Sequence, residues 1–424
     1  MEIKTATSKP AGRFQAVAAL RHRNFRLFWS GQLISLIGTW MQNTAQGWLV
    51  LQMTNSPFLL GLVNAVQFTP FLLLSLVAGV LVDRVPKRRL LVFTQTSLML
   101  LAFVLGILIL FGAVQYWQVL VIAGLSGIVN TLDMPARQSF IIEMVGREDL
   151  MNAIVLNSSI VNAARIVGPA LAGIVIGRIG MAASFLLNGA SFLAVIAGLL
   201  MIRLPVERAK RQEAFPRLGE EIAEGLRYIR RTPVVLSAVS LMALLNVFAS
   251  NFNVLVPVLA RNTLKQQAEG YGWLMSASGL GALLGAAVLA VLSGRRPRMR
   301  LLLGSGIGLC LFQLLLASTR SYTLALLFLG FTGWCWVTFI ASVNTTLQLN
   351  VPDSLRGRVM SVYSLVFAGV TPIGSLLSGS VANLWGAPVG LAVGATLGLL
   401  GVPLVAAYAR RSSVNTLLQV RKPT

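Results

Sequence analysis

Long apolar runs recur along this 424-residue chain and limit what it can fold into. A helix of about 20 apolar residues crosses the roughly 30 Å hydrocarbon layer, and it satisfies its own backbone polar groups there. Twelve such runs lie at 26–51, 57–82, 89–111, 116–136, 152–177, 181–203, 233–259, 271–293, 301–318, 322–348, 358–383 and 386–409. The sequence therefore predicts an all-α polytopic membrane protein with twelve spanning helices.

Composition supports a membrane environment. Hydrophobic residues make up 56% of the chain and charged residues only 11%, whereas charged residues reach about a quarter of ordinary soluble proteins. The first 24 residues are basic and polar, with no isolated apolar stretch before a small-residue cleavage site. We therefore expect no cleavable signal peptide, and we expect the first span to direct insertion.

The positive charge is distributed unevenly along the chain. The net charge is +22, and 30 of the 35 Lys and Arg residues fall on one side of the predicted spans, with four on the other side and one inside a span. Because Lys and Arg are retained on the cytoplasmic side, this pattern predicts a multi-pass inner-membrane protein with both termini cytoplasmic. The charge is thus explained by the lipid bilayer, and nucleic acid is not expected as a partner.

Residues suited to disulfides or metal binding are few. Cys310 and Cys335 lie in separate predicted spans, and His22, the single histidine, lies in the N-terminal segment. These three residues cannot form a disulfide framework or a zinc site. We expect no metal, no cofactor and no catalytic residue, and we expect a monomer.

The longest polar interval divides the spans into two groups of six. Its second part, Phe215–Arg231, places Leu218, Ile222, Leu226 and Ile229 at helical spacing, which predicts an amphipathic surface helix. The predicted parts are a cytoplasmic segment 1–24, a six-helix bundle 25–203, a cytoplasmic linker 204–232, a second six-helix bundle 233–409 and a cytoplasmic tail 410–424.

The two groups of spans share a weak repeat. Glu148-Asp149-Leu150 precedes the fifth span, and Gly168-Pro169 with Gly173 follows about twenty residues later. Asp353-Ser354-Leu355 precedes the eleventh span, and Thr371-Pro372 with Gly374 follows at similar spacing. A duplication of six spans explains this, and such repeats are typical of proteins in which two bundles rock about a central site.

The loop between the second and third spans has a recognisable pattern. Gly79 is followed after three residues by Asp83-Arg84 and then by a basic run that ends at Arg89. This loop resembles the signature loop of the major facilitator superfamily, although Pro86 stands where glycine is commonest. The carboxylate of Asp83 can accept hydrogen bonds from the N-terminus of a helix in the other bundle, and Gly79 would allow the two to approach closely.

Further segments resemble the enterobactin-exporter-like branch of siderophore and multidrug exporters. They are Asn24–Gln32, Pro135–Gln138, Asn162–Pro169 and Leu355–Met360. The resemblance covers nearly the whole chain and implies the major facilitator fold, with two pseudo-symmetric six-helix bundles, and efflux driven by proton antiport. It also implies a pair between Lys87 and Asp133, and Gly168-Pro169 with Gly173 partly matches the antiporter motif of drug exporters. The predicted gate residues are Gly79, Asp83, Arg84, Lys87, Asp133, Arg137, Gly168, Pro169 and Arg356.

Arg165 is a charged residue near the middle of the fifth predicted span. It lies about 20 Å into the span at roughly 1.5 Å per residue, a depth where arginine costs roughly 2.5 to 3.5 kcal/mol on insertion scales. Asp133 in a neighbouring span lies on the order of 15 Å away along the membrane normal, so a direct pair is not expected. Backbone carbonyls, polar side chains and a substrate anion remain alternative partners. The corresponding residue of the eleventh span is Ala368.

Polar residues form stripes on several predicted spans. Those of the first, fifth, seventh and eleventh spans recur at three- and four-residue spacing and so share one face of each helix. Such faces either line a water-filled cavity or form hydrogen bonds between helices. The candidate cavity residues are Gln42, Asn43, Gln46, Asn157, Asn162, Arg165, Asn246, Asn253 and Ser364.

Three kinds of function are considered for a chain with this pattern of spans. The first is a proton-coupled secondary exporter of amphipathic small molecules such as a siderophore, a drug or a related metabolite. No Walker A phosphate loop is present, so ATP is not expected to supply the energy within this chain. An uptake symporter of the same fold is the alternative. A membrane-embedded lipid-modifying enzyme would need clustered acids, histidines or a nucleophile near one interface, and the sequence offers no such cluster.

Overall fold

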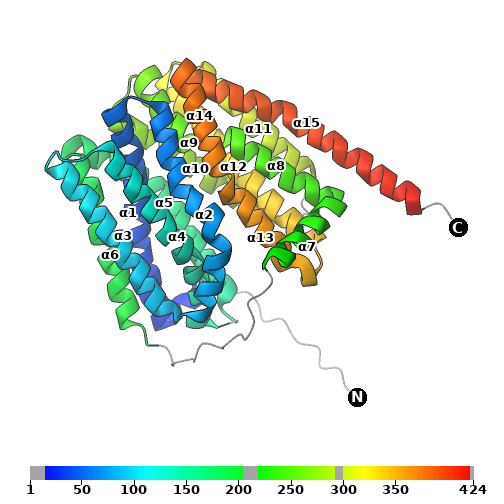
Figure 1. Cartoon of the computed structure of the whole chain (residues 1–424), viewed down its shortest axis with the longest axis horizontal. Helices are drawn as coiled ribbons and strands as arrows, with labels where there is room; N and C mark the ends of the chain where they lie inside the picture. Colours follow the sequence, from blue (N-terminus) through cyan, green and yellow to red (C-terminus); the bar gives the residue numbers. More distant parts are fainter. Residues whose placement is uncertain (1–14, 147, 204–217, 292–298, 421–424) are drawn as a thin grey trace.

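The structure, a computed structural model, describes residues 15–146, 148–203, 218–291 and 299–420, and the regular elements in these ranges are all helices. Figure 1 shows two groups of helices standing side by side, with the N-terminal group on the left. The prediction of an all-helical membrane protein is thus confirmed.

The first bundle follows a 3-10 helix, η1 (Gln15–Arg21), and contains six long helices. They are α1 (Arg23–Thr54), α2 (Pro57–Arg84), α3 (Lys87–Leu110), α4 (Tyr116–Val145), α5 (Leu150–Arg178) and α6 (Met181–Met201). The second bundle follows α7 (Leu218–Arg231). It contains α8 (Pro233–Ala249), α9 (Phe252–Val258), the π-helix η2 (Leu259–Thr263), α10 (Ala268–Val291), α11 (Met299–Ser318), α12 (Tyr322–Asn350), α13 (Asp353–Gly369), α14 (Thr371–Trp385) and α15 (Ala387–Val420).

Most of the predicted spans appear as long helices whose ends differ from the prediction by a few residues. Eleven segments of the described chain are long and apolar enough to cross a membrane. The 32-residue α1 is not among them, because its polar stripe lowers its hydropathy. α15 continues to Val420, so part of the segment predicted as a tail extends the last helix.

Short turns reverse the chain between neighbouring helices. α1 ends at Thr54, the C-cap residue Asn55 has a left-handed φ of 48°, and the next residue caps α2. The Ser56 hydroxyl accepts a hydrogen bond from the Leu59 backbone N–H at 3.3 Å, and Pro57 occupies the first turn. These local signals allow the antiparallel return of α2 beside α1.

Two spans are interrupted about halfway. The seventh predicted span is divided between α8 and α9, and the eleventh is divided between α13 and α14 at Val370. Amide side chains satisfy carbonyl groups at the breaks: Gln313 donates to the Ala249 oxygen, and Asn246 donates to the Phe367 oxygen. The breaks are therefore compatible with a buried position, since freed carbonyls need partners there.

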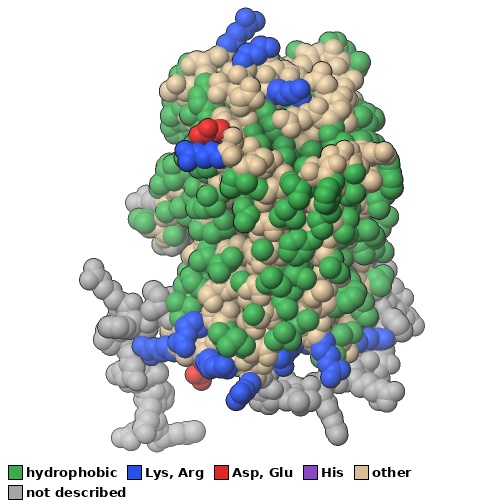
Figure 2. Space-filling model, turned by 90° about the vertical axis from the view of Figure 1, so that its left-hand side faces the viewer, with side chains coloured by type: hydrophobic (Ala, Val, Ile, Leu, Met, Phe, Trp, Pro, Cys, Tyr) green, Lys and Arg blue, Asp and Glu red, His purple; other side chains and the backbone are tan. Residues whose placement is uncertain are grey.

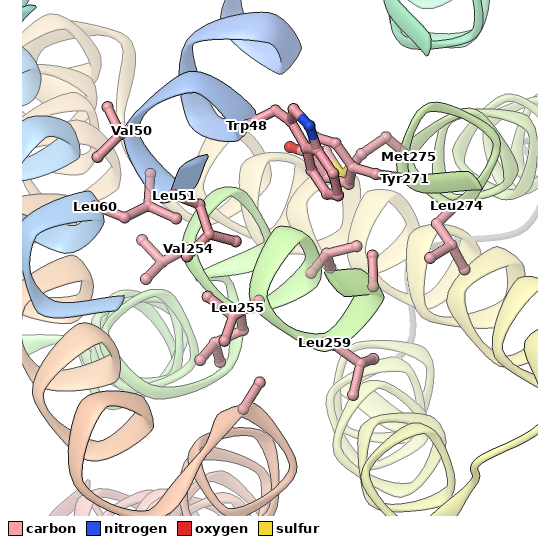
Figure 3. Packing of buried hydrophobic residues seen from close by; sticks show 14 of the residues in the cluster. Trp48, Val50, Leu51, Leu60, Val254, Leu255, Leu259, Tyr271, Leu274 and Met275 are labelled. Atoms are coloured by element: carbon pink, nitrogen blue, oxygen red, sulfur yellow. The ribbon is translucent and has the colours of Figure 1, made fainter. Parts of the chain in front are cut away.

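One end of the molecule is held together by a hydrophobic cluster shared by both bundles. Trp48 and Leu51 of α1 pack with Leu255 of α9 and Tyr271 of α10 in this cluster (Figure 3). The indole of Trp48 and the ring of Tyr271 are stacked, with centroids 5.7 Å apart. We call this end, where α1 finishes, the closed end.

At the opposite end each bundle has a separate hydrophobic cluster. Phe28 and Phe140 belong to the cluster of the first bundle, and Phe339 belongs to that of the second. Neither cluster contains residues of the other bundle, and in Figure 1 the two groups of helices diverge toward this side. The bundles are thus packed together at one end and separate at the other.

Basic side chains gather at the end where the bundles separate. Figure 2 shows a rim of Lys and Arg there, below a wall of hydrophobic side chains, and we call it the basic end. The predicted amphipathic helix is present as α7 from Leu218 onward. Residues 215–217 of the predicted segment lie outside the described ranges. α7 packs on α13, where Glu224 pairs with Arg358 at 2.6 Å and Ile229 is buried.

Candidate functional site

Arg165 lies halfway along α5, where the two bundles meet. Its Cζ atom is 5.5 Å from the centroid of the Trp40 ring in α1, a cation–π contact. Its Nε atom is shielded from solvent and has no hydrogen-bond partner, and among the described residues no acid pairs with it. Among the described residues, no backbone carbonyl or polar side chain accepts a hydrogen bond from Arg165, so its partner there is an aromatic ring.

Close helix crossings position Arg165. A methyl group added at Gly168 would lie 2.5 Å from the Trp40 Cβ atom, so α5 and α1 touch there. On the other side, a methyl group at Gly279 of α10 would lie 2.8 Å from the Arg165 carbonyl oxygen. Pro169 cannot donate to that carbonyl, because it lacks an N–H. The predicted Gly-Pro segment is therefore closely packed, although α5 continues through it without a break.

A small polar pocket lies further along α1 toward the closed end. Its volume is about 50 Å³, room for a few waters. It is lined by residues of α1, α2 and α9: Asn43, Gln46, Gly47, Leu60, Val63, Asn64, Gln67, Phe68 and Asn253. Three predicted cavity residues, Asn43, Gln46 and Asn253, are thus brought together.

Two other predicted cavity residues form hydrogen bonds between helices. The Gln42 side-chain oxygen accepts from Asn188 of α6 at 2.7 Å, within the first bundle. Asn246 is buried and holds the α13 break through the Phe367 carbonyl. The stripes on the first and seventh spans therefore divide between pocket and packing, as an amide can do either.

The remaining predicted cavity residues lie toward the basic end. Asn157 is partly exposed, and Asn162 donates to the Ser158 carbonyl of its own helix at 2.9 Å. Ser364 on α13 is exposed. These three residues are not part of the small pocket.

Asp133 is buried in the first bundle and fully engaged by neighbours. It accepts hydrogen bonds from Thr94 at 2.6 Å and Gln95 at 2.8 Å, and it pairs with Arg137 one turn along α4. The pair with Lys87 that the resemblance implied is not present. Arg137 is closer because it lies at the i+4 position of the same helix.

Lys87 instead pairs with Glu143 near the end of α4, at 2.9 Å. Both side chains are partly exposed, so they meet at the rim of the first bundle rather than beside Asp133. The predicted partner of Lys87 was therefore wrong. Asp133 and Glu143 lie at different positions along the axis of α4, and sequence spacing does not specify which of them Lys87 reaches.

The signature loop is only partly described. A methyl group at Gly79 would meet no described atom within 4 Å, so no described helix makes the predicted close approach there. The Asp83 side chain lies outside the described atoms, and Arg84 is exposed. In the other bundle, Arg356 pairs with Asp353 at 2.6 Å, at the first turn of α13.

Several residues that shape this region were missed by sequence reasoning. Trp40, Gln67 and Asn64 lie at helix positions that look like ordinary packing residues, and their contacts depend on the neighbouring helices. The spacing of Trp40 to Asn43 on one face of α1 was the only available signal. Among the described residues, no group of three or more His, Cys, Asp or Glu could hold a metal ion.

Nearly the whole chain resembles one family. Residues 14–417 match the transmembrane secretion effectors of the major facilitator superfamily. The chain belongs to this family. It is therefore a transporter of the branch that the sequence motifs indicated, and a lipid-modifying enzyme is excluded.

Curated relatives of known name agree with the family. A staphyloferrin A transporter of Staphylococcus aureus is 26% identical and covers 85% of this chain and 90% of its own length. The multidrug efflux pump Tap of Mycolicibacterium fortuitum is 29% identical over 84% and 89%. The enterobactin exporter EntS of Shigella boydii is 25% identical over 89% and 90%.

Solved transporter structures share the fold. A bacterial homologue of the lysosomal transporter Spinster, in an inward-facing and unoccupied conformation, superposes with a TM-score of 0.72 over 97% of this chain and all of that one, at 14% identity. A POT family transporter in complex with 5-aminolevulinic acid gives a TM-score of 0.73 over 92% and 96%, at 10% identity. At these identities the likeness concerns the fold alone.

Proposed function

We propose that the chain is a proton-coupled secondary exporter that moves amphipathic small molecules, such as a siderophore, a drug or a related metabolite, by alternating access. Relatives named as an enterobactin exporter and a multidrug efflux pump support the direction and the substrate class. The bundles would rock about the region of Arg165. Cargo would enter from the cytoplasm or the inner leaflet.

The observation that carries this proposal is the unequal packing of the two ends. A shared hydrophobic cluster closes one end, while the two clusters at the basic end belong to separate bundles. If the basic end is cytoplasmic, this structure corresponds to the inward-open state of the cycle. That state is the one in which an exporter takes up its cargo.

The proposed topology has twelve spans, a bacterial inner-membrane location and both termini in the cytoplasm. α1 is taken as the twelfth span beside the eleven apolar ones, because its 32 residues extend about 48 Å at 1.5 Å per residue. The basic end of Figure 2 supports a cytoplasmic placement of that end. The parts 1–24, 25–203, 204–232, 233–409 and 410–424 remain the proposed divisions, and the chain is proposed to act as a monomer.

We assign the gate to residues near the basic end and the cargo path to the region between the bundles. In the outward-open state, Gly79 and Asp83 would meet the first turn of α13, near Arg356, and close the cytoplasmic side. The free space around Gly79 is what supports a later approach. Lys87 and Arg84 belong to the same proposed gate. Asp133, which pairs with Arg137, is the candidate proton carrier, since it is a buried carboxylate.

Inverted membrane vesicles test the proposal. Vesicles that contain the chain, energised so that their lumen is acidic, are expected to accumulate a substrate from a panel of dyes, antibiotics and catecholate siderophores. Vesicles without the chain, or treated with a protonophore, would not. Accumulation in right-side-out vesicles instead would identify an uptake symporter.

The same assay tests the proton carrier. Asp133→Asn is expected to abolish proton-driven accumulation while leaving substrate binding intact. The control is Glu143→Asn, which removes a partly exposed acid of the same helix. Unchanged proton-driven accumulation in Asp133→Asn would remove Asp133 from this role without affecting the proposed direction of transport.

A further inference from the structure

Two polar features between the bundles lie on the same side of α1. Trp40, Asn43 and Gly47 recur at three- and four-residue spacing and therefore share one face of the helix. Trp40 stacks with Arg165, whereas Asn43 and Gly47 line the small polar pocket described above, which we call the amide pocket. At 1.5 Å per residue, the α1 residues of the pocket lie between about 5 Å and about 10 Å from Trp40, toward the closed end.

The first feature, Arg165, is a cation whose hydrogen-bond donors are unused. Arg165 forms no ion pair and no hydrogen bond with the described residues, and its buried Nε atom lacks a partner. The Arg165 side chain as a whole is partly exposed. A guanidinium fork in this condition suits a carboxylate, which it can bind through two parallel hydrogen bonds.

The second feature, the amide pocket, is lined by uncharged side chains. Asn43 and Asn253 are exposed to the pocket and form no hydrogen bond with described residues, and Gln46 and Gln67 approach each other at 3.4 Å. Each amide offers both donors and an acceptor, so the pocket suits hydroxyl or amide groups. Its volume of about 50 Å³ has room for a few polar atoms, so it suits one end of a cargo molecule.

We propose that Arg165 and the amide pocket form one two-part binding site for cargo that carries a carboxylate at one end and uncharged hydroxyl or amide groups at the other. The inference rests on the proposed function, because it takes the ligand to be the transported molecule. A cation of the same size is repelled by Arg165. The site thus selects anionic cargo within the wider class of amphipathic molecules.

Binding to the purified full-length chain, measured by calorimetry, tests the site without transport. The probes are 3,4-dihydroxybenzoate, its uncharged methyl ester and benzoate, which lacks the hydroxyl groups. The chain is expected to bind dihydroxybenzoate at least tenfold more tightly than the ester. Arg165→Gln is expected to remove this preference, and Arg165→Lys to retain part of it. Arg178→Gln, which removes an exposed charge from the same helix, is the matched control and should behave as the unaltered chain.

The hydroxyl end has its own variant. The unaltered chain is expected to bind dihydroxybenzoate several times more tightly than benzoate, and Asn43→Leu to bind both equally. Equal binding of acid and ester by the unaltered chain, or equal losses in Arg165→Gln and Arg178→Gln, would overturn the proposal. Acid-selective binding without efflux in vesicles would instead contradict the proposed function and leave the site standing. If Arg165→Gln fails to fold, the acid–ester comparison and Arg165→Lys still decide.

Discussion

Asp133 illustrates how much a single buried charge depends on its neighbours. Its side chain is only 2% exposed, yet Thr94, Gln95 and Arg137 provide hydrogen bonds to both carboxylate oxygens. A buried ion pair adds little net stability, because desolvation offsets its attraction, but the loss of one partner leaves the other charge unpaired. If Asp133 is neutralised, Arg137 is the charge that is left unpaired.

We therefore expect Asp133→Asn to destabilise the protein by on the order of 3 kcal/mol, and the double variant Asp133→Asn with Arg137→Gln to recover most of it. The measurement is the melting temperature of the purified chain in detergent. Glu143→Gln breaks the partly exposed pair with Lys87 and should cost less than about 1 kcal/mol. A double variant less stable than Asp133→Asn would contradict this account of the pair.

At the scale of helices, glycines decide where two elements can cross. Sequence spacing marks Gly281 and Gly285 in α10, and Gly304 and Gly308 in α11, as similar small-residue pairs. Only the structure separates them. A methyl group at Gly281 would overlap the Gly330 carbonyl of α12, whereas one at Gly304 would meet no atom within 4 Å.

Gly281→Ala is expected to destabilise the chain by roughly 1 to 3 kcal/mol, because the added methyl group must push α10 and α12 apart. Gly304→Ala, its matched control, should be neutral or slightly stabilising, since alanine favours the helix and meets free space. Melting temperatures of both purified variants check this. Equal stability of the two variants would mean that the crossing is looser than it is in the structure.

Across the whole molecule, the closed end is held by contacts between the bundles. Besides the stack of Trp48 on Tyr271, Arg261 donates to the Leu51 carbonyl. At the start of α2, the Ser56 hydroxyl lies 2.9 Å from the Asn383 side-chain oxygen of α14. Alternating access requires all of these contacts to break in the outward-open state.

A cross-link at this end should therefore stop transport. In a chain with Cys310→Ala and Cys335→Ala, the pair Ser56→Cys with Asn383→Cys is expected to form a disulfide. This cross-link should abolish the efflux that is measured as substrate accumulation in inverted vesicles. Reduction should restore the efflux, and each single cysteine variant should transport normally. Full transport by the oxidised pair would show that the closed end need not open.

The overall organisation could be predicted from the sequence better than the individual contacts could. The helical spans, the amphipathic α7 and the membership of the secretion effector family follow from patterns that hold over many residues. The partner of Lys87 was wrong, and Trp40 was overlooked beside Arg165. Each of these depends on the height and rotation of two helices, which local spacing does not specify.

The sequence by itself determined that the chain is built from long apolar helices, because hydrophobic length can be read residue by residue. The placement of Lys and Arg along the sequence likewise predicted which end carries the positive charge. The tertiary structure alone decided which polar side chains remain available. Asn246 and Gln42 serve packing, whereas Asn43 and Asn253 meet in a pocket and Arg165 rests on an indole. The physical reason is that an amide on a helix face binds whatever lies opposite it, and only the packed bundles place a neighbouring helix or open space there.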